Sequence, residues 1–262
     1  MNVTTIAGTT AGTTAGTTEA SLRLDLLCAY HALDLDGQAS GLGGHVSARA
    51  AGEQAFWCHA FGLAFDEVTE DDLIKLDFKL NKLAGNGKVN PTLIFHARIY
   101  AARSDVQCVV HTHADHVTAL TATGAPFEMV IQLAAILHEG TAILDEYEGI
   151  IEGQGGGDQL AQALGAKRLL LLKNHGLISV GRSVGEAVIG ALVAEANAAA
   201  HLKALATGSV NALPAQAARD AKRFLTSATN TADRWAMLKR RAARARPDFI
   251  PAAVLQTSLP TP

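Results

Sequence analysis

The sequence predicts a mixed α/β domain built around a largely buried sheet. Two apolar runs, VQCVVHTH (106–113) and RLLLLKNHGLISVG (168–181), lack a polar face, as expected of strands that are covered on both sides. Segments with apolar residues at helical spacing surround these runs, and the longest of them spans 184–206. The chain has 262 residues, 48% of them hydrophobic, which is enough to bury one sizeable core.

The first third of the chain predicts one helix followed by several strands. The helix spans 18–38, with Glu19 in its first turn and Gly37 near its end. Thr69 is an N-cap candidate with acidic residues after it. The Asn-Gly pair in KLAGNGKVN (82–90) is typical of a hairpin turn. The expected strands are 41–50 after its glycine-rich turn, 54–65 with a turn at Gly62, and the last part of 67–78.

Helices and strands alternate in the rest of the chain. PTLIFHARIYAAR (91–103) predicts a helix with Pro91 in its first turn. The run MVIQLAAIL (129–137) fits a strand and a helix equally well. The remaining elements are a strand at 106–113, a helix at 157–166, two strands joined by a tight turn within 168–181, the helix 184–206, and a basic helical tail at 215–246.

Charge and composition do not favour nucleic-acid or membrane partners. The formal net charge is −3, so no basic surface for nucleic acid or anionic lipid is indicated. The longest apolar stretch (186–206) is interrupted by Glu186, Glu195 and His201, which is typical of a buried helix in a soluble protein.

The cysteines and the N-terminus suggest a cytoplasmic protein. Cys28, Cys58 and Cys108 are odd in number and far apart, so they do not predict a disulfide framework. Residues 1–18 repeat an Ala-Gly-Thr-Thr unit with little apolar content, and we expect them to be disordered. They lack the basic and apolar regions of a signal peptide.

Three histidines stand at the ends of two buried strands. His111 and His113 are two residues apart on a strand, so their side chains lie on the same face. His175 follows the second buried run in an Asn-His-Gly sequence. Three converging neutral imidazoles would hold a divalent metal with positions left open for water or substrate. The alternative is two hydrogen-bonded strand-end histidines and a simple turn. Asp115 is a further candidate for a fourth ligand.

The chain resembles the class II aldolase/adducin family from about Ser21 to His201. The resemblance rests on the ordered segments GGHVSAR (43–49), FGLAFDEVTEDDLIKLD (61–77), FHARIYAARSDVQCVVHTHADH (95–116) and LLLLKNHGLISVG (169–181). It implies a three-layer α/β/α sandwich with a central, mostly antiparallel sheet at 19–210. It also implies one Zn²⁺, Mn²⁺ or Fe²⁺ ion per subunit on His111, His113 and His175. The family is usually tetrameric, with sites between subunits, and residues 211–262 are then a helical extension that packs on the domain or on a neighbouring subunit.

The sequence departs from the sugar-phosphate members of this family. Their catalytic acid stands just before the helix that precedes the His-x-His pair, and Thr92 occupies its place here. A threonine cannot abstract a proton from carbon near neutral pH. The phosphate-binding segments depart as well, since they read Gly44-His45 and Phe61-Gly62. The chain is more similar to a branch that lacks the acid and decarboxylates hydroxylated aromatic or heteroaromatic carboxylates.

Decarboxylation needs no base, because loss of CO₂ itself generates the carbanion. It needs an electron sink, which a metal ion supplies as a Lewis acid, and then a proton donor. We expect His45 or His59 to bind a second carboxylate or to supply the proton, and His116 to line the pocket or orient a ligand. The substrate-binding residues that we expect are His45, Arg49, Thr92 and Tyr147.

Other histidines have structural interpretations. His96 on the preceding helix is interpreted as a structural hydrogen-bonding residue, and His31 and His201 as surface or helix-packing residues. His138 lies in a stretch that often contributes pocket residues in this family.

Three other functions stay open. An aldolase or epimerase acting on a hydroxy-carbonyl or sugar-phosphate substrate would need another base, and Asp115 and Asp145 are the nearby acids. A non-haem iron oxygenase is compatible with three histidines. An adducin-like interaction module would keep the fold without catalysis, although such proteins typically lack the metal histidines.

Overall fold

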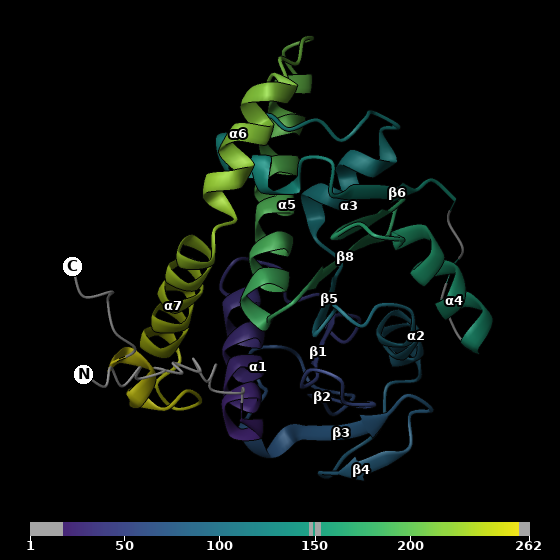
Figure 1. Cartoon of the computed structure of the whole chain (residues 1–262), viewed down its shortest axis with the longest axis vertical. Coiled ribbons are helices and arrows are strands. Elements are labelled where there is room, and N and C mark those ends of the chain that lie inside the picture. Colours follow the sequence, from purple (N-terminus) through teal and green to yellow (C-terminus); the bar gives the residue numbers. More distant parts are fainter. Residues whose placement is uncertain (1–17, 147–148, 150–152, 257–262) are drawn as a thin grey trace, which may run out of the picture.

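The computed structural model describes residues 18–146, 149 and 153–256. These residues form three layers, with a mixed sheet between two groups of helices (Figure 1). The expected α/β/α sandwich is therefore confirmed. The predicted disorder of residues 1–18 concerns a segment that lies outside the described residues, apart from Thr18.

The sheet has eight strands in the order β4-β3-β2-β1-β5-β8-β7-β6. All neighbouring strands are antiparallel except β6 and β7, which are parallel. The strands are β1 (His45–Ala48), β2 (Ala55–His59), β3 (Leu73–Asp77), β4 (Lys82–Ala84), β5 (Cys108–Thr112), β6 (Thr141–Leu144), β7 (Leu169–Leu172) and β8 (Gly176–Gly181). The central strands β1, β5 and β8 are buried along their whole length. The apolar runs that contain β5 and β8 predict this burial.

One face of the sheet is covered by α1 (Glu19–Asp34), α3 (Asp115–Ala122), α5 (Val184–Leu205) and α7 (Ala228–Ala245), whose buried residues join one hydrophobic cluster. The other face is covered by α2 (Ile94–Ala102) and α4 (Gly153–Leu164), which contribute to a second cluster. The two groups stand on opposite sides of the sheet in Figure 1. Short 3₁₀ helices are η1 (Glu70–Asp72), η2 (Pro91–Leu93), η3 (Gln132–Leu137) and η4 (Ala252–Gln256).

Local sequence explains where several helices begin. The Thr18 hydroxyl accepts from the backbone N–H of Ser21 at the start of α1, and the Ser183 hydroxyl accepts from the N–H of Glu186 at the start of α5. The Asn90 side chain caps η2, where Pro91 fits because the first helical position needs no N–H donor. Helix α5 is long and apolar enough to cross a membrane by composition, but 56% of its most apolar window is buried in this fold.

The C-terminal tail forms two helices where one helical region was expected. Helix α6 (Ala215–Leu225) packs on η3, and α7 packs on α1 and α5. Ion pairs Lys239–Asp25 (3.0 Å) and Arg246–Asp34 (2.6 Å) join α7 to α1. The extension therefore packs on the domain of its own chain. Contact with a neighbouring subunit, and the domain boundary near 210, stay predictions.

Three local predictions were wrong or incomplete. The Asn-Gly pair at 86–87 does not form the hairpin turn, because the chain reverses earlier, where Asp77 Oδ1 accepts from the N–H groups of Lys79 and Asn81. The ambiguous run 129–137 contains neither a strand nor an α-helix, but the 3₁₀ helix η3. The edge strand β6 was not predicted, since its residues are only partly buried and carry no clear alternation.

Candidate active site

The strand ends bring His111, His113 and His175 together at one end of the sheet. Their ligand atoms all lie within 4.8 Å of one another. The Nε2 atoms of His113 and His175 are 3.1 Å apart, which is near the ~3.3 Å that separates two nitrogen ligands of a tetrahedral Zn²⁺ ion. β5 carries the first histidine, the residues just after it carry the second, and the turn between β7 and β8 carries the third.

The surroundings leave all three imidazoles neutral and able to bind a metal. His111 Nδ1 lies 2.9 Å from the carbonyl oxygen of Leu177, which can only accept, so Nδ1 carries the hydrogen and Nε2 is free. Burial, together with the neighbouring His113, lowers the pKa of His175 to about 4. Burial also lowers the pKa of His113 and holds that of His111 well below its usual range. The donor set therefore fits a divalent ion.

Two glycines allow the backbone to approach these histidines. A Cβ at Gly43 would lie 2.4 Å from Cε1 of His113, so a larger residue would displace the ring. Gly176 has φ +151°, and a Cβ there would lie 2.2 Å from the carbonyl oxygen of Thr112. The Asn-His-Gly turn therefore needs its glycine in order to carry His175 next to β5.

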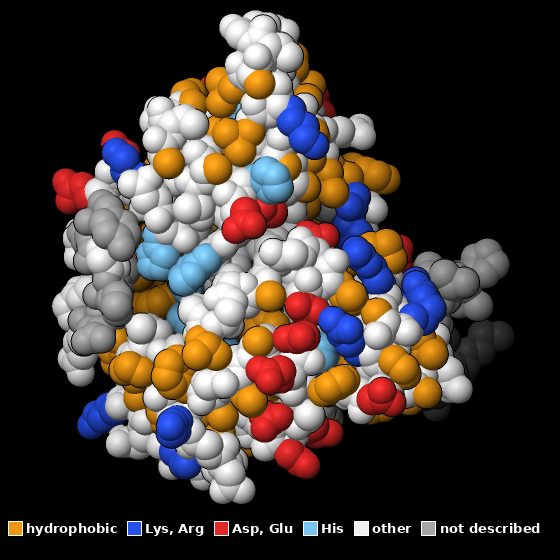
Figure 2. Space-filling model, turned by 180° about the vertical axis from the view of Figure 1, so that it is seen from behind, with side chains coloured by type: hydrophobic (Ala, Val, Ile, Leu, Met, Phe, Trp, Pro, Cys, Tyr) orange, Lys and Arg blue, Asp and Glu red, His pale blue; other side chains and the backbone are white. Residues whose placement is uncertain are grey.

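A large cavity of about 1040 Å³ opens beside the three histidines, at the upper end of the ~300–1,000 Å³ usual for small-molecule sites. Figure 2 shows histidine side chains gathered in a hollow on this face. The described lining residues include no lysine or arginine. They are Leu42, Gly43, His45, Phe61, Asn90, Pro91, Thr92, Phe95, His111, His113, Asp115, Thr118, Ala119, Ala122, Gly149, Leu160, Leu172, Asn174 and His175.

His45 lies in the wall of this cavity, with its ring centroid 4.9 Å from that of His111. Its Nε2 is 3.1 Å from Thr92 Oγ1, and its Nδ1 is 2.8 Å from His96 Nε2. Behind it, His96 Nδ1 is 2.6 Å from Ser47 Oγ, which is 2.8 Å from Tyr100 Oη. The interpretation of His96 as a structural hydrogen-bonding residue is thus confirmed.

The hydrogen-bond acceptor at Asn90 determines which group donates in each hydrogen bond of this series. Asn90 Oδ1 accepts from the backbone N–H and from the hydroxyl of Thr92. The Thr92 hydroxyl hydrogen is therefore used, and His45 must donate from Nε2 to Thr92 Oγ1. His45 Nδ1 then accepts from His96 Nε2–H, and His96 Nδ1 accepts from Ser47.

The structure does not bring three of the expected site residues into the cavity. Strand alternation turns His59 to the α1 face, against Tyr30 (ring centroids 4.8 Å apart), whereas His45 faces α2. Arg49 stands at the far end of β1, where its guanidinium donates to the carbonyl oxygens of Val106, Arg103 and Glu53. Its expected substrate contact is thus contradicted, as is the catalytic placement of His59.

His116 also turns away from the cavity. It lies in the first turn of α3, where its Nδ1 is 2.7 Å from Oε1 of Glu195 on α5. The Glu195 carboxylate also accepts from the backbone N–H groups of His116 and Val117. His116 therefore helps to anchor α3 to α5, and its expected role in the pocket is corrected. Tyr147 lies outside the described residues.

The remaining candidates are placed as follows. Asp115 begins α3 and lines the cavity, although it is not part of the histidine cluster. Asp145 instead pairs with Lys173 (2.9 Å). His31 is hydrogen-bonded to the carbonyl of Val68, and His138 lies beside Glu139, away from the site.

Asn90 and Phe95 are residues of the cavity wall that the sequence interpretation missed. The N-cap position of Asn90, just before Pro91, was the available signal for Asn90.

The sequence matches the class II aldolase and adducin N-terminal domain over residues 24–202. The chain belongs to this family. Class II aldolases use a divalent metal ion, and the histidine cluster fits one. Family members bind small molecules and are commonly oligomeric.

Three relatives of this class II aldolase/adducin chain are informative. A Caulobacter vibrioides protein named "Putative aldolase class 2 protein" is 33% identical over 77% of this chain and 80% of its own length. The 4-hydroxy-3-prenylphenylpyruvate oxygenase/4-hydroxy-3-prenylbenzoate synthase of Streptomyces roseochromogenus subsp. oscitans is 30% identical over 63% of this chain and 60% of its own. The decarboxylase NovR of Streptomyces niveus is 30% identical over 66% of this chain and 64% of its own length.

Solved structures of the family share the fold. An aldolase II superfamily protein from Pseudomonas syringae superposes with a TM-score of 0.79 at 27% identity and covers 87% of this chain and 94% of its own. The L-fuculose 1-phosphate aldolase from Glaciozyma antarctica PI12 has a TM-score of 0.80 at 24% identity, with 88% and 92% covered. The fold of the metal-binding aldolases is thus present in this chain.

Proposed function

We propose that this protein is a divalent-metal-dependent carbon–carbon lyase that decarboxylates a hydroxylated aromatic or heteroaromatic carboxylate. His111, His113 and His175 are the metal ligands in this proposal. The observation that carries it is the composition of the cavity, which joins three neutral histidines to a wall whose described residues include no lysine or arginine. Thr92 stands in that wall where the sugar-phosphate enzymes have an acid.

An ion held by these histidines would act as a Lewis acid and would stabilise negative charge that develops on a substrate oxygen. The protein's own contribution is to position the substrate. Phe61, Phe95 and Leu172 offer an apolar wall to a ring. A phosphate dianion would find no cationic side chain among the described lining residues, which disfavours a sugar-phosphate substrate.

His45 is the remaining candidate for direct contact with the substrate among the three expected catalytic histidines. Its Nε2–H lies in the cavity wall beside the hydroxyl of Thr92. A substrate carboxylate would replace Thr92 Oγ1 as the acceptor of the His45 Nε2–H bond. The names of the two Streptomyces relatives, a decarboxylase and a benzoate synthase, support an aromatic carboxylate as the substrate class.

Aldol cleavage is the second candidate, because Asp115 is the one carboxylate among the described lining residues. The Asp115 carboxylate could serve as the base, a role that the hydroxyl of Thr92 cannot fill. In this alternative the substrate would be a hydroxy-carbonyl compound, and carbon–carbon cleavage would release an aldehyde.

The test is CO₂ release by Mn²⁺- or Zn²⁺-loaded protein from a panel of hydroxylated aromatic and heteroaromatic mono- and dicarboxylates. We expect release that a chelator abolishes and that His113→Ala also abolishes, together with its bound metal. His138→Gln is the matched control, because this histidine lies outside the cavity. Aldehyde products that disappear in Asp115→Asn would establish aldol cleavage instead. Consumption of O₂ by Fe²⁺-loaded protein would establish oxygenase chemistry.

We also propose a cytoplasmic homotetramer with the cavities near subunit interfaces, in line with the family's usual assembly. Light scattering coupled to gel filtration would measure the mass, and a monomer at micromolar concentration would contradict the proposal.

A further inference from the structure

A second cavity lies at the opposite end of β8 from the three histidines. It has a volume of about 360 Å³, within the ~300–1,000 Å³ range of small-molecule sites. Its walls come from η3, β8, α5 and the two C-terminal helices α6 and α7. Its charged lining residues are Arg168, Arg182, Lys222 and Arg234 against Glu139 and Glu186. Cationic groups are therefore in excess.

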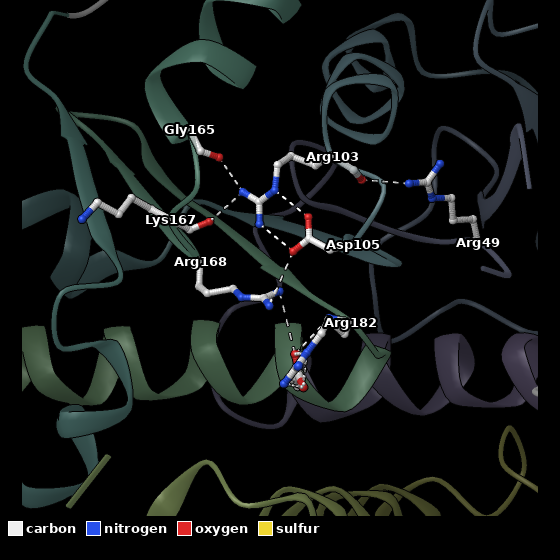
Figure 3. Close-up of polar contacts among 8 residues, drawn as sticks. Arg49, Arg103, Asp105, Gly165, Lys167, Arg168 and Arg182 are labelled. Carbon is white, nitrogen blue, oxygen red and sulfur yellow. Dashed lines mark hydrogen bonds and ion pairs between the residues drawn. The ribbon is translucent and has the colours of Figure 1, made fainter. Parts of the chain in front are cut away.

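The two carboxylates near Arg168 are already bound by other arginines (Figure 3). Asp105 accepts from Arg103 at 2.7 and 2.8 Å, and these bonds lower its pKa to about 2. Glu186 accepts from Arg182 at 3.0 Å. Arg168 is left at 3.6 Å from Asp105 and 3.9 Å from Glu186, which are ion-pair but not hydrogen-bond distances. Its Nη1 is buried and has no hydrogen-bond partner among the described residues.

Two cations on the opposite wall have no carboxylate partner among the described residues. Lys222 on α6 donates from Nζ to the carbonyl oxygen of His138 at 2.5 Å. Arg234 on α7 has a buried Nε without a hydrogen-bond partner. The structure shows no carboxylate within 4.0 Å of either cation in its described part. Burial lowers the pKa of Lys222; Glu139 raises it, and the neighbouring Lys167 and Arg168 lower it.

Positive charge that is partly removed from water, as on Arg168, Lys222 and Arg234, is costly unless an anion compensates it. An ordered water would satisfy the free N–H groups of Arg168 and Arg234, but it would leave the excess charge in place. A small ligand with several anionic oxygens would satisfy both needs, because guanidinium and ammonium groups form their strongest hydrogen bonds with charged oxygens.

We propose that this second cavity binds a small doubly charged oxyanion, a phosphate or a short dicarboxylate, between Arg168, Lys222 and Arg234. The site is built from the sheet and the C-terminal helices together, so its ligand would tie α6 and α7 to the domain. It shares no lining residue with the histidine cavity. The proposal is therefore independent of the decarboxylase proposal.

Isothermal titration of metal-loaded, full-length protein with inorganic phosphate, and separately with succinate, tests this proposal at constant ionic strength held with chloride. We expect one site per chain for at least one of the two anions, and the stronger of them indicates the source of the ligand. Lys222→Met and Arg234→Leu should each weaken binding about tenfold or more. Lys222→Arg keeps the charge and should retain it. Glu139→Gln removes a negative charge from the rim and should tighten binding.

Lys203→Met is the matched control, because this exposed lysine of α5 lies outside the lining. His113→Ala should bind the anion as the unmodified protein does, which separates this site from one at the metal. Circular dichroism and thermal unfolding verify that each variant is folded. The proposal is overturned if neither anion binds below about 10 mM. Equal affinities in the unmodified protein, Lys222→Met and Arg234→Leu would overturn it as well.

Discussion

His96 donates from Nε2 to Nδ1 of His45 across 2.8 Å, and this bond holds the cavity-wall histidine in a single tautomer. The bond joins α2 to the first residue of β1, so a buried side chain of the helix layer supports the tautomer of His45 that its contact with Thr92 requires. Partners of this kind orient active-site histidines and commonly change activity by ~10–100-fold when they are removed.

Ser47→Ala tests the role of this hydrogen-bond chain. The substitution leaves Nδ1 of His96 buried without a donor, which should lower the free energy of unfolding by about 1–3 kcal/mol. It also removes the donor that fixes His96 as the hydrogen-bond donor to His45, so His45 is held less firmly. We therefore expect kcat for decarboxylation to fall about tenfold with little change in KM. Tyr100→Phe is the control, because it removes only the hydroxyl behind Ser47. Its stability should fall by about 1 kcal/mol with kcat retained; equal losses of kcat in both variants would contradict the idea.

Gly43→Ala should weaken metal binding without unfolding the protein. The added methyl would lie 2.4 Å from Cε1 of His113, at the free end of a side chain that can turn away. We expect a loss of about tenfold or more in metal affinity, measured by competition with a chromogenic chelator. Gly155→Ala is the matched control, since no atom lies within 4 Å of its Cβ position. Unchanged affinity in Gly43→Ala would mean that His113 is not a ligand.

His59 should make the metal-free protein sensitive to acid. Burial lowers its folded-state pKa to about 4, whereas an unfolded histidine titrates near 6.5. Between these values the unfolded state binds more protons, so stability falls as the pH falls from about 6.5 to 4. His59→Phe, placed between Tyr30 and Phe65, should remove up to about 3 kcal/mol of this loss. Urea unfolding at pH 7 and pH 4.5 measures the loss of unfolding free energy between the two pH values. An equal loss in the unmodified protein and in His59→Phe would show that His59 does not cause it.

Arg49 and His116 should affect stability but not chemistry. Arg49 donates to three carbonyl oxygens at the far end of β1, so Arg49→Met should destabilise the protein by about 2 kcal/mol or more. His116→Gln should cost less, because its side chain is 50% exposed. In both variants kcat/KM should stay within about threefold, whereas His45→Ala should lose about a hundredfold. A hundredfold loss of kcat/KM in His116→Gln would show that His116 acts in the active site.

Local signals were sufficient for most of the fold. Apolar runs without a polar face identified β5, β7 and β8. Helical spacing identified α1, α2 and α5, supported by Glu19 in the first turn of α1 and by Pro91 ahead of α2. The edge of the sheet was harder, because β4 and β6 are short and partly exposed, so burial leaves little pattern in their sequence. The hairpin at Asp77 likewise depends on a side chain that closes the turn rather than on the Asn-Gly pair nearby.

Side-chain placement across the sheet could not be read from the sequence. His45 and His59 were equivalent candidates, yet strand pairing turns one toward α2 and the other toward α1. Arg49 was assigned to the substrate because it follows His45 closely, but four residues of extended strand carry it to the other end of the sheet.

The sequence by itself determined the family, the layered fold and the three histidines that converge at one end of the sheet. These features depend on local spacing and on motifs that can be recognised without knowing the tertiary contacts. Only the tertiary structure decided which other side chains join the three histidines. It placed Asp115 and Asn90 in the wall of the histidine cavity and arranged the hydrogen-bonded series of side chains from Tyr100 to His45. It also formed the cationic cavity between the sheet and the C-terminal helices. These contacts join residues far apart in sequence, and packing of the helices on the sheet selects them.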